Sequence, residues 1–156
     1  MKNIILASIL LFSAAAHAQE HKGMEGKLAT NAAFKGAEAN KAAYNAIYQL
    51  DSNNPDIVKK AFRNINNVLN DPRLQGKLHL ELITFSGGTE VMLKDSPYAE
   101  DLKKLIDKGV IVAQCTNSLQ ERNLKKEQLY DFISFVPSGN GELVIRASEG
   151  WVIVKP

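Results

Sequence analysis

The stretch Gly109-Val-Ile-Val-Ala-Gln-Cys-Thr-Asn-Ser-Leu119 decides the fold of this chain. Its residues 110–113 form an unbroken apolar run rich in β-branched side chains, which is typical of a strand covered on both faces. Polar residues then end the run, and we expect Thr116 or Asn117 to cap a following helix. The sequence therefore predicts that Cys115 lies where a buried parallel strand passes into a helix.

Cys115 is the only cysteine among the 156 residues, so an internal disulfide is excluded. In open α/β sheets, ligands bind at the carboxyl ends of the strands, and the start of a helix stabilises a thiolate. A lone cysteine is also often a small, inert core residue. Both interpretations stay open at this point, and a reactive thiol at a strand end is expected to be partly accessible.

The first residues have the three parts of a secretory signal peptide. Met1-Lys2-Asn3 is a short positive start, residues 4–16 are apolar, and Ala16-His17-Ala18 is a small-x-small cleavage site before Gln19. We therefore expect residues 1–18 to be removed and the mature protein to be periplasmic or otherwise exported, and soluble. No later apolar stretch is long enough to span a membrane.

The mature chain divides into a leader and one domain. Residues 19–41 are rich in Ala, Gly, Lys and Glu without a clear period, which indicates a flexible or only partly helical leader. Residues 42–156 form a single domain. The net charge of +2 and the absence of a basic run give no reason to expect a nucleic-acid partner.

Strands and helices alternate along the domain with short connections. Asn54 and Pro55 predict the start of a helix, and Gly109, Asn123 and Gly150 are suited to left-handed helix ends. Strands are expected over residues 42–50, 78–85, 110–113, 132–136 and 151–154, and helices over 55–70, 89–94, 97–108, 117–122, 125–130 and 142–148. This order predicts a three-layer α/β/α sandwich with a mainly parallel five-stranded sheet.

Four polar pairs follow the predicted strands and should emerge on one rim of the sheet. They are Asp51-Ser52, Ser86-Gly87, Cys115-Thr116 and Ser138-Gly139. The strand order does not follow from the sequence, so which of them are neighbours stays open. The pair Gly87-Gly88 favours a plain strand-to-helix turn over a phosphate cradle, which needs a fuller glycine pattern.

The sequence lacks the residues that several common kinds of catalytic, metal-binding and cofactor-binding site require. The mature chain holds only His21 and His79, and His79 begins a strand far from the rim, so Ser-His-Asp and Cys-His arrangements are not supported. Ligand clusters for a metal and a dinucleotide fingerprint are also missing, so we expect no metal and no cofactor. Arg122 lies two helical turns after Cys115, and surface solvation is its commoner role.

A set of motifs in order resembles the DsrE/DsrF-like family over residues 42–156. They are Lys94-Asp95-Ser96-Pro97-Tyr98-Ala99-Glu100, Gly109-Val110, Cys115-Thr116-Asn117-Ser118-Leu119 with Arg122, Val136-Pro137-Ser138-Gly139, Glu149-Gly150-Trp151 and Lys155-Pro156. The resemblance implies a small α/β/α domain that assembles into trimers or hexamers. In the sulfur-relay members, such as the TusD-like proteins, a cysteine at this strand end carries sulfur as a persulfide, a role that maps onto Cys115. The family often has Arg-Gly where this chain has Arg122-Asn123, and Asn tolerates the same turn.

Two functional hypotheses follow. The first is an exported sulfur carrier or sulfurtransferase that uses a persulfide on Cys115, supported by the rim residues Thr116, Asn117, Arg122, Ser86, Gly87, Ser138 and Gly139. Its partners would be a sulfur donor or acceptor, either a protein or a small sulfur compound. The relay members work in the cytoplasm, so an exported member needs other partners. The second hypothesis is a non-catalytic, oligomeric binding module for a small ligand or a protein partner.

Overall fold

The computed structural model describes residues 23–156, and the predicted signal peptide lies outside the described residues. The chain divides into two compact units, Met1–Glu38 and Ala39–Pro156. In the first unit, residues 23–33 form a helix within the segment predicted as a partly helical leader. No helix in the described part of the chain has the length and apolar character needed to cross a membrane.

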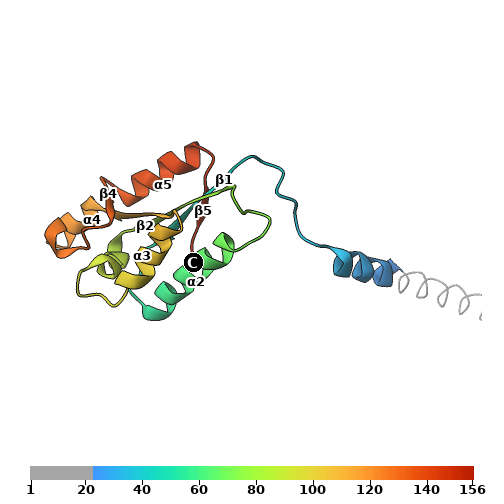
Figure 1. Ribbon diagram of the computed structural model, residues 1–156, viewed down its shortest axis with the longest axis horizontal. Coiled ribbons are helices and arrows are strands. Elements are labelled where there is room, and N and C mark those ends of the chain that lie inside the picture. The colour runs from blue at the N-terminus through green and yellow to red at the C-terminus, as the bar shows by residue number, and fades with distance from the viewer. Residues whose placement is uncertain (1–22) are drawn as a thin grey trace, which may run out of the picture. The chain divides into compact units, whose positions relative to one another are not determined.

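The second unit is built on a five-stranded sheet in the order β4-β3-β2-β1-β5 (Figure 1). The strands are β1 (Tyr44–Leu50), β2 (Leu78–Thr84), β3 (Ile111–Cys115), β4 (Ser134–Val136) and β5 (Val152–Val154). Every neighbouring pair is parallel. The predicted parallel five-stranded sheet is therefore confirmed, and the structure adds its strand order.

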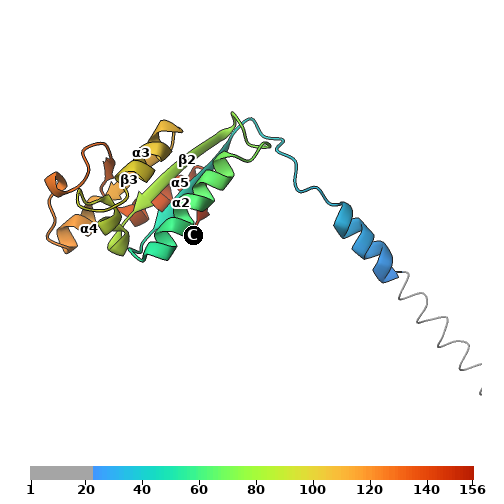
Figure 2. The ribbon, with the colours of Figure 1, turned by 60° about the horizontal axis from the view of Figure 1, so that its bottom comes forward.

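Helices cover both faces of the sheet, as the alternating pattern predicted. The helices α2 (Pro55–Leu69) and α3 (Ala99–Asp107) lie on one face, and α5 (Gly139–Ser148) lies on the other. Figure 2 shows α2 running along the sheet, where it contacts β1. Three short helices complete the order: η1 (Ser86–Met92), α4 (Thr116–Glu121) and η2 (Lys126–Gln128). The α/β/α sandwich is thus asymmetric, with one long helix on the α5 side.

Alternation along the strands divides the core between the two faces. Leu82 and Val112 belong to the larger cluster under α2 and α3, whereas Ile83 and Ala113 belong to the smaller cluster under α5. Because successive side chains of a strand point to opposite faces, Cys115 lies on the same face as Ala113. The thiol therefore belongs to the α5 side of the sheet.

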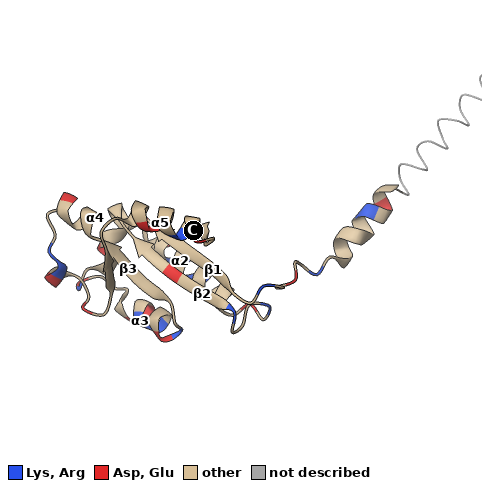
Figure 3. Cartoon of the chain, turned by 90° about the horizontal axis from the view of Figure 1, so that it is seen from above, with Lys and Arg blue, Asp and Glu red and all other residues tan. Residues whose placement is uncertain are grey.

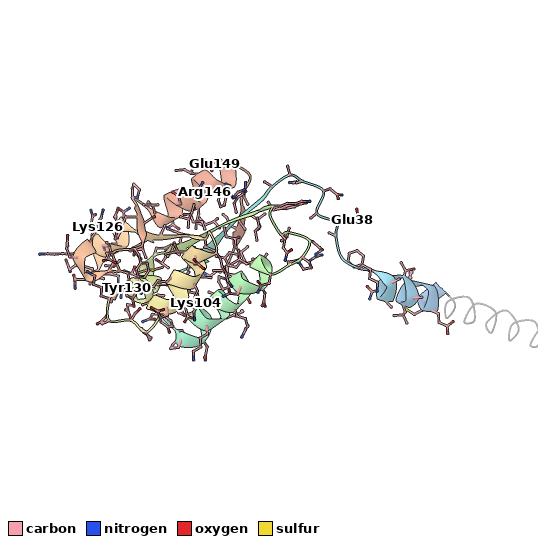
Figure 4. The ribbon with its side chains drawn as sticks, viewed as in Figure 1. Glu38, Lys104, Lys126, Tyr130, Arg146 and Glu149 are labelled. Atoms are coloured by element: carbon pink, nitrogen blue, oxygen red, sulfur yellow. The ribbon has the colours of Figure 1, made fainter. Side chains whose placement is uncertain are left out.

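A buried ion pair attaches α5 to the centre of the sheet. Arg146 Nε lies 2.8 Å from Glu81 Oε2 and 3.0 Å from Glu142 Oε1, and its Nη1 lies 3.3 Å from Glu149 Oε2. Figure 4 shows Arg146 on α5 and Glu149 at the end of this helix, and the guanidinium also lies 4.3 Å from the centre of the Trp151 ring. Glu81 is only 1% exposed, and burial raises the pKa of its carboxyl.

Charges of both signs are interspersed over the helices and connections in the view of Figure 3.

The predicted ends of several helices are confirmed by their local geometry. The Asn54 side chain accepts a hydrogen bond from Asp56 N (2.9 Å), and Pro55 is the first residue of α2. Asn123 and Gly109 have the left-handed backbone expected of them, with φ of 53° and 85°. The last long helix begins at Gly139, three residues earlier than predicted, because Ser138 Oγ accepts from Gly141 N (3.1 Å) and caps it.

The glycine pair after β2 serves packing, which agrees with the predicted plain turn. A Cβ on Gly88 would lie 2.0 Å from the carbonyl oxygen of Leu50. The turn therefore passes directly against the end of β1. Its helical segment is a 3-10 helix that starts at Ser86, three residues before the predicted helix.

Candidate functional site

A cavity of about 320 Å³ lies at the carboxyl ends of the strands. Asp51, Ser86, Cys115 and Ser138, each following or ending a different strand, all line it. The structure thus brings the four predicted rim segments together around one space. The remaining lining residues are Phe85, Asn117, Ser118, Glu121, Gly139 and Asn140.

Cys115 is the last residue of β3 and is 4% exposed. It is therefore more buried than the partly accessible thiol that the sequence led us to expect. Cys115 nevertheless lines the cavity, and within residues 23–156 no hydrogen bond to its sulfur is seen. A buried cysteine that lines a cavity differs from an inert core cysteine, which has packing atoms on every side.

Thr116 and Asn117 lie next to Cys115 but do not cap α4. The cap residue is Cys115 itself, without a side-chain capping bond. Thr116 Oγ1 donates to the carbonyl oxygens of Val136 (3.2 Å) and Pro137 (3.1 Å), and Asn117 N donates to Pro137 O (3.2 Å). The capping prediction was wrong because α4 already begins at Thr116, whose hydroxyl bonds to carbonyl oxygens at the end of β4 and just after it. These bonds instead tie the start of α4 to the end of β4.

The sequence reasoning missed Gln114, which holds the backbone at the thiol. Its Nε2 donates to Cys115 O (2.8 Å) and to Thr89 Oγ1 (3.0 Å), and its Oε1 accepts from Thr84 Oγ1 (2.7 Å). All three side chains are fully buried. A glutamine at the end of an otherwise apolar strand was the available signal, because a buried amide needs partners.

The rim residues Ser86 and Gly139 line the cavity, whereas Gly87 lies beside Ser86 without lining it. Ser86 N donates to Ser118 Oγ (3.0 Å) and so joins η1 to α4. A Cβ on Gly87 would lie 3.1 Å from Asp51 O, and one on Gly139 would lie 2.6 Å from Phe85 Cδ1. Both glycines therefore permit close contacts between neighbouring segments of the wall.

Arg122 lies away from the Cys115 cavity. Its guanidinium forms an ion pair with Glu90 Oε1, and it lines a second, larger cavity. Arg122 is an exposed residue, in keeping with the commoner role of surface solvation, and its side chain is 33% exposed with one fixed partner. Arg122 is thus separate from the thiol, although both belong to the α4 region.

Charge around the thiol is acidic rather than basic. Asp51 and Glu121 are the charged lining residues, and Asp51 Oδ2 lies 2.8 Å from Lys155 Nζ. The lining holds no Lys, Arg or His, so no imidazole or cationic side chain of the cavity is placed to activate Cys115. Among residues 23–156, no group of three or more His, Cys, Asp or Glu side chains is arranged to hold a metal ion. The chemistry available is therefore that of one thiol among hydroxyls, amides and two carboxylates.

The fold and this cavity define a class: a parallel α/β/α protein with a single cysteine where its strand ends converge. Residues 10–156 match the DsrE/DsrF-like family, and the chain belongs to that family. No curated protein matches it.

Solved structures of similar fold agree with this assignment. The protein of unknown function MTH1491 from Methanobacterium thermoautotrophicum is 27% identical with a TM-score of 0.68, and the match covers 72% of this chain and 99% of that one. The conserved protein of unknown function BT1422 from Bacteroides thetaiotaomicron is 12% identical with a TM-score of 0.59, and the match covers 72% of this chain and 94% of that one. The second likeness concerns the fold alone.

Proposed function

We propose that this protein is an exported sulfur carrier that holds sulfane sulfur as a persulfide on Cys115. The observation that supports the proposal most directly is the position of Cys115, at a strand end and facing a cavity built from four strand ends. Membership of a sulfur-relay type of family points to the same chemistry. Export rests on the amino-terminal pattern of residues 1–18.

The transfer conserves atoms and electrons. The Cys115 thiolate attacks the outer, sulfane sulfur of a donor persulfide, R–S–SH, while the S–S bond of the donor breaks. The products are Cys115–S–SH and the thiolate R–S⁻, and an acceptor thiolate later removes the same sulfur by an equivalent attack. The lining offers no imidazole, so the thiol proton leaves to solvent, to the incoming donor or to a lining carboxylate.

The cavity is suited to a small sulfur group rather than to a large substrate. Its volume of about 320 Å³ lies at the lower end of the range for ligand pockets. Hydroxyl and amide groups of Ser86, Asn117, Ser138 and Asn140 line it and are able to donate hydrogen bonds to a persulfide. The donor or acceptor, whether a protein or a small sulfur compound, has only to present one sulfur atom at the opening.

Intact-mass spectrometry after incubation with polysulfide tests the proposal. We expect an added mass of about 32 Da, one sulfur atom, which dithiothreitol removes. Cys115→Ser should show no adduct while keeping the circular dichroism of the folded protein. A folded wild type that gains no sulfur would favour the rival hypothesis of a non-catalytic binding module.

We also propose that the protein works as a homo-oligomer, a trimer or a hexamer. Val144 and Ile145 on α5 are 69% and 53% exposed, and Ile111 and Ile153 are exposed on the sheet face that α5 covers. Exposed aliphatic side chains on the thinly covered side of a sandwich are suited to burial between subunits. Light scattering on the wild type and on Val144→Lys tests this, and a monomeric wild type at tens of micromolar would contradict it.

A further inference from the structure

A second cavity, of about 750 Å³, lies in the domain and shares no lining residue with the Cys115 cavity. Four segments line this open cavity: the connection from β1 to α2, the helix η1, the segment leading into α3 and the end of α4. Its volume is within the range of small-molecule sites, and it is more than twice that of the Cys115 cavity. The proposed sulfur transfer on Cys115 assigns no role to this second cavity.

Most of the wall is apolar and is held in place by packing. The Tyr98 ring makes an edge-to-face contact with Phe62, with ring centres 5.8 Å apart, and Val91 is buried in the main core. Because these groups are fixed by neighbours, the wall is formed before any ligand arrives, which lowers the entropic cost of binding. The apolar lining residues are Pro55, Val91, Leu93, Pro97, Tyr98 and Leu124.

The polar end of the cavity is an ordered chain of three side chains. Glu90 Oε1 pairs with Arg122 Nη2, and Glu90 Oε2 accepts from Asn53 Nδ2 (2.5 Å). Both oxygens of Glu90 are thus occupied. Arg122 uses one of its five N–H donors, and Glu90 is its sole polar partner within residues 23–156. The guanidinium is therefore oriented, partly shielded from water and still able to donate.

One further charge lines the cavity and has to be weighed against Arg122. Asp95 is exposed and forms no ion pair with another described residue, so its interactions at a distance are screened by water and salt. Arg122, whose side chain is 33% exposed, has an orientation fixed by Glu90, which strengthens a bond to an oxyanion. The head group that suits this end is therefore anionic.

We propose that this cavity binds a small organic carboxylate. The apolar body of the ligand lies against Tyr98, Pro97 and Leu124, and its carboxylate accepts from the free N–H groups of Arg122. Glu90 has two effects, since it orients the guanidinium and competes for it. The site does not involve Cys115, so this proposal can be tested independently of sulfur transfer.

Three probes with one apolar body and different head groups test the charge class: 3-phenylpropionate, 3-phenylpropylamine and 3-phenylpropan-1-ol. Titrations followed by ¹H–¹⁵N spectra of the protein should show saturable shifts with the carboxylate, centred on Glu90, Tyr98 and Arg122. For a fragment of this size we expect a dissociation constant of about 1 mM, with the alcohol several-fold weaker. The amine should not bind. Binding of the amine as tight as that of the carboxylate, or no saturable shift with any probe, would overturn the proposal.

Two variants distinguish recognition by Arg122 from a merely structural role. Arg122→Gln should weaken 3-phenylpropionate about tenfold and leave the alcohol unchanged, because one charge-assisted bond is lost. Glu90→Gln should increase the affinity for 3-phenylpropionate, because the substitution removes the anion that competes for Arg122 and keeps a hydrogen-bond acceptor beside it. If both variants weaken all probes alike, the ion pair only maintains the fold and the proposal is wrong. Cys115→Ser, the matched control, should leave binding unchanged.

Discussion

Gln114 holds the backbone of its neighbour Cys115, with Nε2 donating to the Cys115 carbonyl oxygen at 2.8 Å. The same amide joins the hydroxyls of Thr84 and Thr89 on the opposite face of the strand from the thiol. The position of the sulfur therefore depends on a polar group that is fully buried and does not line its cavity.

Replacing Gln114 should lower stability and disturb the site together. Gln114→Met keeps the approximate volume but leaves two buried hydroxyls without their amide partner, so we expect a loss of about 2–4 kcal/mol in the free energy of unfolding. Urea denaturation measures the loss. Thr89→Val removes one partner only and should cost less; an equal or larger loss would show that the network does not centre on the amide.

Cys115 should react slowly but measurably in the folded protein. Its 4% exposure restricts access, whereas the cavity admits a small reagent. We expect iodoacetamide to modify native Cys115 at least about tenfold more slowly than in urea, and a bulky maleimide more slowly still. Intact mass against time gives the rates. Native modification as fast as in urea would mean an open thiol, and modification only through global unfolding would mean a core residue.

Gly88→Ala should be among the most damaging single-methyl substitutions in the domain. The new Cβ would lie 2.0 Å from Leu50 O, which is backbone and cannot rotate away. Moving the turn separates η1 from β1, and we expect a cost of about 3 kcal/mol or more in thermal or urea unfolding. Gly26→Ala is the control, because its Cβ meets nothing within 4 Å. A tolerated Gly88→Ala would show that the turn is free to shift.

Arg146→Met should destabilise the domain in a pH-dependent way. The variant leaves Glu81 buried without its cation, which costs about 3–5 kcal/mol at neutral pH. The pKa of Glu81 is already raised above 4.5 by burial, and loss of Arg146 raises it further.

The sign of this pH dependence follows from linkage. An acid with a raised folded pKa destabilises the fold as pH rises above 4.5, so the variant should regain stability on acidification through the folded pKa of Glu81. Denaturation at several pH values measures the effect. The double variant Glu81→Gln with Arg146→Met, which has no buried charge there, should lose this dependence; if it keeps the dependence, another group titrates.

The fold was predictable because its signals are local. Asn54 with Pro55, Gly109 and Asn123 mark helix ends through their own backbone preferences, and the apolar run before Gln114 marks the buried strand β3. The strand order and the meeting of four rim segments were not available, because the sequence pattern does not record which strands pair. Thr116 was misjudged as a cap for the same reason, since its partners Val136 and Pro137 lie some twenty residues further along the chain.

The separate cavity at Arg122 also could not be predicted from the sequence. Spacing along one helix placed Arg122 two turns after Cys115, but the residue that decides its role is Glu90, 32 positions earlier. Only the packing of α4 against η1 brings the two together. Long-range partners of this kind determine whether a charged residue is a solvated side chain or part of a site.

The opposite orientations of Gln114 and Cys115 affect how this protein can change over evolution. The amide side of β3 is locked into the core by Thr84 and Thr89, so substitutions there risk the whole domain. The thiol side faces exposed residues at the ends of α4 and α5, such as Asn117, Glu121 and Asn140, whose side chains are not part of that network. Descendants of this chain can therefore change the surroundings of the thiol through these helix ends, while the sulfur atom keeps its place.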